Sequence, residues 1–378
     1  MKRLAIPLSN QRTVAKWLVM RIELRFSGLT VRFSLKQRKI KQSHTFCPPV
    51  KSIIDNIQAY LGHPLMLLAL FVAASFTMIW RLHAMESKGF EGTVLGTLIM
   101  PYCSGFANLV FAYVMSNSAS NGGLVIENCL VNNATNLTLI LGLAAVFGSA
   151  AIVQNGKARQ KKHAEFHRIN RLNLLFTLIA LFLFTGTLWA LAKDGKLDFY
   201  DGLVLVALFL FWQILHVFEV LKDKIRKNKA FHWTIVIDVV ILAASAYCIY
   251  FAVDHLVEWV SKTENQFFSF AKLGWFSGLL MVLPNAFIAM YYAYIGRQDI
   301  VLSSQIGDGH ICIPMCIGLF SLFNPIQVPD FFQTGTYIIL GAGAVLFLSV
   351  AVLGRVPRFM GAGLIGAYAL FLYQGLIQ

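Results

Sequence analysis

The chain has 378 residues, of which 57% are hydrophobic and only 13% are charged, and this composition excludes an ordinary soluble domain. The formal net charge of +14 would suit a nucleic-acid-binding protein, but its distribution along the chain excludes that class as well. The six cysteines form no C-x-x-C pair, so the sequence predicts neither a disulfide framework nor a zinc site.

Ten apolar segments are long enough to cross a bilayer, which takes about 20 residues of helix. They lie near residues 64–81, 92–116, 123–152, 173–192, 200–221, 233–254, 274–295, 300–323, 335–353 and 358–376. Sixteen Lys and Arg residues lie in the loops after odd-numbered segments, and only four lie in the loops after even-numbered ones. Because cytoplasmic loops are the basic ones, we expect a multi-pass protein of the bacterial inner membrane with both termini external and no nucleic-acid partner.

Residues 1–60 form a basic N-terminal tail, which conflicts with an external N-terminus. Up to residue 50 the tail carries one acid, Glu23, and no apolar run of span length. Three interpretations stay open: translation that begins near Val50, an Arg-rich targeting presequence, or a tail lying on the membrane surface. We favour the first, which retention of Met1 in the intact mass of the native protein would contradict.

Residues 274–324 combine long apolar runs with polar side chains at membrane depth. Pro284 and Asn285 interrupt the first run, and a short polar turn follows at 296–299. The second run carries Ser303, Ser304, Gln305, Asp308, His310 and Cys312. Polar groups are costly in hydrocarbon, so we expect these side chains to face a cavity or another helix. Proline also frees backbone groups that can coordinate a ligand.

An echo of this stretch lies at residues 101–147. With one extra residue allowed, the correspondence pairs Asn108 with Asn285, Glu127-Asn128 with Ser303-Ser304, Asn132 with Asp308, Asn136 with Cys312, and Leu141-Gly142-Leu143 with Ile317-Gly318-Leu319. A rival register places Tyr102, after Pro101, opposite Asn285, but it needs a longer insertion. Two interrupted, polar-lined segments at corresponding positions of two halves indicate a transporter's binding site.

The two stretches resemble the repeats of the sodium/calcium exchanger superfamily, whose pattern runs roughly G-[ST]-x-x-P-E, a short turn, then G-N-x-x-G-S-N-x-x-[ND]. The resemblance implies an all-α membrane protein with ten transmembrane helices in two inverted five-helix repeats. The repeats would be residues 61–225, with their motif at 92–147, and residues 226–378, with their motif at 274–324. It further implies a secondary transporter that exchanges Ca²⁺, Na⁺ or H⁺ by alternating access at the membrane midplane, and not an enzyme.

The chain departs from the family pattern at its charged positions. Asn108 and Asn285 stand where the family has its ion-binding Glu, and the family's G-S-N reads Val131-Asn132-Asn133 and Gly307-Asp308-Gly309. Two carboxylates remain in the repeats, Glu127 and Asp308. If both reach the site ionised, they balance one divalent or two monovalent cations, whereas Asp308 alone suits one monovalent ion or a proton.

Hard cations prefer carboxylate, amide and hydroxyl oxygens, and these groups are what the repeats supply. The predicted ion-binding residues are Asn108, Glu127, Asn132, Asn136, Asn285, Ser303, Ser304, Asp308 and Cys312. Within this set the metal ligands are predicted to be Asn108, Asn132, Asn285 and Asp308, although interhelical hydrogen bonding is the competing role for the asparagines. No cofactor is expected beyond the transported cations. The oligomeric state stays open, and a monomer would suffice.

Three further polar features allow two interpretations each. Asp238 could relay protons or pair with the basic loop at 222–232. His310 could couple protons, but we favour a histidine hydrogen-bonded within the bundle. For His163 and His167, spaced i and i+4, we favour a solvated cytoplasmic face over a metal site.

Two other functions compete with cation exchange. An exchanger fold without the family's Glu pair could serve as a sensor or scaffold that transports nothing. A remote alternative is an intramembrane aspartyl protease, because Gly307-Asp308 and Tyr200-Asp201 faintly resemble that class's motifs. Asp201, however, is expected at a membrane edge, so the two acids would not meet at one peptide bond.

Overall fold

The computed structural model describes residues 25–26, 29–30, 63–87, 105–116, 121–148, 160–224, 234–262, 270–294 and 298–376. The chain divides into two units, Met1–Ile54 and Asp55–Gln378. In the first unit, β1 (Arg25–Phe26) pairs antiparallel with β2 (Leu29–Thr30). The interpretations of the N-terminal tail, the rival register at Pro101 and Tyr102, and the side chains of His163 and His167 lie outside the described residues.

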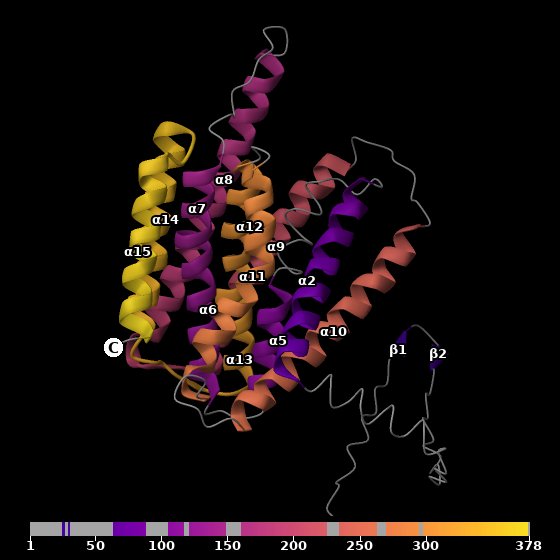
Figure 1. The fold of residues 1–378 in the computed structure, drawn as a ribbon. Coiled ribbons are helices and arrows are strands. Elements are labelled where there is room, and N and C mark those ends of the chain that lie inside the picture. Colours follow the sequence, from indigo (N-terminus) through magenta and orange to yellow (C-terminus); the bar gives the residue numbers. More distant parts are fainter. Residues whose placement is uncertain are drawn as a thin grey trace, which may run out of the picture. The chain divides into compact units, whose positions relative to one another are not determined.

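Helices build the second unit (Figure 1). In chain order its described helical segments are α2 (Pro64–Ser87), α5 (Phe106–Met115), α6 (Gly122–Ala134) continued by η3 (Thr135–Ile140) and α7 (Leu141–Phe147), α8 (Gln160–Leu191) with η4 (Ala192–Asp194), α9 (Phe199–Lys224), α10 (Thr234–Lys262), η5 (Phe270–Lys272) with α11 (Leu273–Tyr294), α12 (Gln298–Ile311) continued by η6 (Cys312–Ile317) and α13 (Gly318–Phe323), α14 (Phe332–Leu348) with η7 (Ser349–Leu353), and α15 (Arg358–Leu376). Two short strands, β3 (Lys196–Leu197) and β4 (Ile326–Gln327), pair antiparallel between helix ends.

The predicted all-α membrane protein is confirmed. Within the described residues, seven helical segments are long and apolar enough to cross a membrane, and two shorter apolar helices, Phe106–Met115 and Phe199–Leu215, accompany them. Large apolar side chains are exposed along the outer helices, as with Phe211 of α9 and Leu370 of α15, and hydrocarbon is the solvent that suits them. The exact number of ten crossings stays a prediction.

The two central helical segments, 122–147 and 298–323, run in opposite directions (Figure 1). At one end, a Cβ added to Gly122 would meet Ile326, which follows the end of α13. At the other end, a Cβ added to Gly148 would meet the side chain of Gln298, where α12 begins. Each segment therefore starts where the other ends, as inverted repeats require.

Equivalent helices of the two halves make equivalent packing contacts. α2 packs on α10, and α8 packs on α14, so each of these pairs joins equivalent helices. Six other contacts form three matched couples: α15 on α7 with α9 on α13, α14 on α6 with α12 on α8, and α10 on α5 with α11 on α2. This pattern bears out the predicted inverted repeats. Their predicted boundary at 225/226 lies between described segments.

Two pairs of glycines bring helices of the two halves into close contact. A Cβ on Gly142 of α7 would lie 2.8 Å from the carbonyl oxygen of Gly361 on α15. In the equivalent place, a Cβ on Gly202 of α9 would lie 2.7 Å from the carbonyl oxygen of Gly318 on α13. Because Gly142 and Gly318 correspond in the two repeats, the same backbone-to-backbone contact is built twice. Small residues allow such close approach between membrane helices.

Gly361→Ala should destabilise the protein, whereas Gly363→Ala should not. A methyl group at 361 would lie 2.8 Å from the carbonyl oxygen of Gly142, whereas one at 363 has nothing within 4 Å. We expect a cost of about 1–3 kcal/mol at 361, typical of overpacking, and no loss at 363, where alanine is the better helix former. Thermal unfolding in detergent measures both variants. Equal melting temperatures would show that the α7–α15 contact is looser than described.

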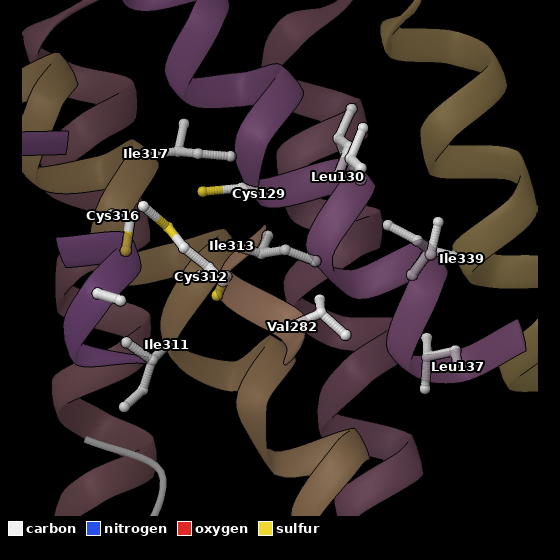
Figure 2. Packing of buried hydrophobic residues seen from close by; sticks show 14 of the residues in the cluster. Cys129, Leu130, Leu137, Val282, Ile311, Cys312, Ile313, Cys316, Ile317 and Ile339 are labelled. Atoms are coloured by element: carbon white, nitrogen blue, oxygen red, sulfur yellow. The ribbon is translucent and has the colours of Figure 1, made fainter. Parts of the chain in front are cut away.

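Buried aliphatic residues fill the space between the central helices. Figure 2 shows Cys129, Cys312 and Cys316 among buried side chains such as Val282 and Ile313. All three cysteines are fully buried and free, so they pack as small apolar residues. The polar side chains described next lie within this apolar packing.

Candidate functional site

One face of the first central segment carries a row of asparagines. Asn128, Asn132 and Asn136 are spaced four residues apart along α6 and η3, so they lie on the same side of the helix. All three side chains are fully buried. Since buried amides need hydrogen-bond partners, the contacts of this row define what it faces.

The row joins the other half of the protein at Asp308. Asn136 Nδ2 donates to Asp308 Oδ2 on α12 at 2.8 Å, and also to Asn132 Oδ1 at 3.0 Å. Asn132 Nδ2 donates to Asn108 Oδ1 on α5 at 3.4 Å. On the other side, Asn285 Nδ2 of α11 donates to Asp308 Oδ2 at 3.3 Å. These five residues, here called the central cluster, are at most 6% exposed.

The contacts within the central cluster have the same two-fold correspondence between the repeats as the helix contacts. Asn132 with Asn108 corresponds to Asp308 with Asn285, at 3.4 Å and 3.3 Å. Asn136 with Asp308 corresponds to Cys312 with Asn132, whose sulfur-to-oxygen distance is 4.0 Å. The pairing of Asn108 with Asn285 inferred from the sequence therefore places both residues in equivalent contacts.

Irregular backbone flanks the cluster in both halves. η3 and η6 are π-helical turns at nearly corresponding positions, each continuing one central segment. Pro314 lies within η6, and Pro284 lies inside α11 directly before Asn285. Proline removes a helical hydrogen bond, and π-helical turns are frequent at functional sites. The backbone is therefore interrupted in the cluster's neighbourhood.

Four predicted ligands differ from the central cluster in their placement. Ser303 is exposed and donates to the carbonyl of Ile300, while the half-buried Ser304 donates to the carbonyl of Val301. Glu127 packs against Gly274 of α11. Cys312 touches the cluster only through its 4.0 Å contact with Asn132. Their roles as ion ligands stay predictions, as do those of the cluster residues.

Asn128 of the row and its partner Ser277 were not among the predicted ligands. Asn128 Nδ2 donates to Ser277 Oγ of α11 at 2.9 Å, and Ser277 Oγ donates to the carbonyl of Gly274 at 3.0 Å. The spacing of Asn128 from Asn132 is a signal that the sequence offered. Ser277 offered none, because a lone serine in an apolar helix commonly bonds to its own backbone.

Asp238 and His310 have partners within the bundle. Asp238 is buried, and its Oδ1 lies 3.5 Å from an Nη1 of Arg81 on α2, so one partner comes from the first segment rather than from the basic loop. His310 Nε2 lies 3.0 Å from the carbonyl oxygen of Thr177 on α8, and its ring packs edge-on against Phe184 and Trp212. These contacts agree with the favoured interpretation of His310 as a hydrogen-bonded bundle residue.

Comparisons with known proteins point in one direction. A family model described as "Sodium/calcium exchanger protein" matches residues 60–218 and 237–374. No curated protein matches the sequence. Solved structures of the sodium-calcium exchanger NCX_Mj resemble the chain with TM-scores of 0.56 after soaking with 2.5 mM Na⁺ and 0.1 mM Sr²⁺, and 0.55 in zero Na⁺ and Ca²⁺. These two are 19% and 18% identical and cover 82% and 85% of this chain and 97% and 99% of that one, so they show the fold alone.

Proposed function

Because the chain belongs to the sodium/calcium exchanger protein family, a family of membrane transporters, we propose that it exchanges cations by alternating access at the central cluster. The observation that carries this proposal is the hydrogen-bonded contact of both halves at Asp308, with Asn136 from one repeat and Asn285 from the other. A site shared by two inverted repeats is where a transporter of this architecture holds its substrate.

The chemistry of the cluster suits a hard cation. Its members offer four amide oxygens and one carboxylate, and Oδ1 of Asn136 is buried with no hydrogen-bond partner. Amide and carboxylate oxygens replace the water shell that an ion loses when it enters the membrane. The amide groups can turn to present oxygen to the ion, since their present hydrogen bonds join members of the same cluster.

The charge of the cluster favours a monovalent cation. Asp308 is its single carboxylate, because Asn108 and Asn285 replace the family's Glu and Glu127 lies against Gly274. A divalent ion would leave one positive charge uncompensated at membrane depth, which is costly. NCX_Mj was soaked with Na⁺ and Sr²⁺ or Ca²⁺, and of these ions Na⁺ fits one negative charge. We therefore propose Na⁺ as the main substrate, with H⁺ as the alternative ligand of Asp308.

Ion flux into proteoliposomes tests this function. Vesicles holding the purified chain and unlabelled Na⁺ should take up radioactive Na⁺ in exchange, and external Li⁺, K⁺, Ca²⁺ or a proton gradient then identifies the counter-ion. We expect Na⁺ exchange without Ca²⁺ uptake. Ca²⁺ uptake with no Na⁺ exchange would overturn the monovalent assignment. A folded protein that moves no cation at all would favour the sensor or scaffold.

The two acids of the protease alternative, Asp201 and Asp308, have different hydrogen-bond partners. Asp201 lies at the start of α9, where its Oδ2 accepts a hydrogen bond from the backbone N–H of Asp198 at 2.9 Å. Asp308 instead accepts from Asn136 and Asn285. These contacts support the exchanger proposal, and the protease stays the remote alternative.

A further inference from the structure

A second group of oxygens lies one helical turn before the central cluster, between α6 and α11. Asn128 is fully buried, and its Nδ2 donates to Ser277 Oγ at 2.9 Å. Ser277 Oγ in turn donates to the carbonyl oxygen of Gly274 at 3.0 Å. Oδ1 of Asn128 is buried and has no hydrogen-bond partner. An orphaned buried acceptor costs free energy unless something binds it.

A carboxylate completes this group. A Cβ on Gly274 would lie 2.7 Å from Oε2 of Glu127, so glycine is what lets the carboxylate approach the backbone of α11. Oε2 of Glu127 is also buried without a hydrogen-bond partner, although the residue as a whole is only half-buried. Carboxylate, amide, hydroxyl and backbone carbonyl oxygens thus meet at one helix contact, and these are ligands that hard cations prefer.

We infer that Glu127, Asn128, Ser277 and the carbonyl of Gly274 form a second cation-binding site, here called the Glu127 site. This inference rests on the proposed function and deepens it. One carboxylate gives the Glu127 site a single negative charge, so it takes the same monovalent cation as the central cluster. Glu127 is partly exposed, whereas the residues of the central cluster are buried.

The asparagine row connects the two sites. At about 1.5 Å of rise per residue, Asn128 lies about 6 Å from Asn132 along the helix, and Asn132 lies the same distance from Asn136. Each step presents an amide on the same face, with Ser277, Asn108 or Asp308 across from it. A cation leaving the Glu127 site therefore meets oxygen ligands at each turn and is never exposed to the apolar core alone.

Equilibrium binding of radioactive Na⁺ to the purified chain tests the inference. We expect wild-type protein to bind two ions per chain, and Glu127→Gln and Asp308→Asn to bind one each. The double variant should bind none. Glu258→Gln removes an exposed carboxylate that pairs with Lys262 on α10, so this matched control should still bind two. Ser277→Ala keeps both carboxylates but removes one oxygen ligand of the Glu127 site. It should therefore weaken Na⁺ binding at the Glu127 site about tenfold.

A purely structural Glu127 gives a different set of results. Two ions bound by Glu127→Gln, together with a lowered melting temperature, would overturn the inference. If Glu127→Gln does not fold, unchanged Na⁺ binding by Ser277→Ala would overturn it instead. The same measurement distinguishes failure of the inference from failure of the proposed function. If the central cluster binds no ion, Asp308→Asn should bind as many ions as wild type, while Glu127→Gln should bind one fewer.

Discussion

Asp308→Asn is expected to abolish Na⁺ exchange while leaving the protein folded. Asp308 carries the only negative charge in the central cluster, and an asparagine of nearly the same shape retains an oxygen to accept from Asn136 and Asn285. Two unit charges about 4 Å apart attract by about 4 kcal/mol at an effective dielectric constant of about 20, which corresponds to nearly a thousandfold in affinity. We therefore expect at least a hundredfold loss of exchange at fixed Na⁺ concentration, measured as uptake of radioactive Na⁺ into proteoliposomes.

The melting temperature in detergent separates this result from unfolding. Replacing a buried carboxylate by a neutral amide removes a desolvation cost, so the variant should melt at the wild-type temperature or above it. Asp330→Asn makes the same chemical change at an exposed position before α14 and should exchange Na⁺ normally. Full exchange by Asp308→Asn would remove the central cluster from the transport path.

Asn285→Glu is expected to confer tighter Ca²⁺ binding than we expect of the natural chain. The substitution restores the carboxylate of the family pattern at a position whose side chain lies 3.3 Å from Asp308. Two adjacent carboxylates repel each other until a divalent ion balances them, and Ca²⁺ prefers carboxylate ligands. The variant should therefore be less stable than wild type without Ca²⁺ and regain stability with it. At a hundredfold excess over the dissociation constant, bound Ca²⁺ contributes about 2.7 kcal/mol.

Asn285→Gln is the matched control for this gain. Glutamine has the length of glutamate without its charge, so it tests whether size alone changes the site. We expect Ca²⁺ to raise the melting temperature of Asn285→Glu by several degrees and to leave Asn285→Gln unchanged. A rise in both variants, or in neither, would contradict the charge-based assignment of the substrate.

The sequence predicted which positions of the two repeats correspond better than it predicted which side chains face the central cluster. Asn132 corresponds to Asp308 and Asn136 to Cys312 by spacing alone, and all four residues have mutual contacts in the structure. Glu127 and Ser303 also correspond to each other, yet each lies five residues before its cluster member. Five residues on a helix turn a side chain away from the original face, whereas four keep it there.

The four-residue spacing rule places Asn128 correctly beside the cluster but does not place Ser304 correctly. Asn128 lies four residues before Asn132 and belongs to the row, so helical geometry would have chosen it over Glu127 as a neighbour of the cluster. Ser304 lies four residues before Asp308, but its hydroxyl bonds to the backbone of its own helix. A short hydroxyl can bond to the backbone of its own helix, and the spacing of residues does not reveal whether it does so.

The glycine contacts between the halves also set an order of events during synthesis. The face of α7 that carries Gly142 packs against Gly361 of α15, and the ribosome adds Gly361 only after all of the preceding helices. Until α15 is synthesised, we expect the first repeat to enter the bilayer without the helix that packs against α7. A nascent chain stopped before residue 358 should therefore be inserted yet remain a target for membrane proteases, whereas one carried through α15 should resist them.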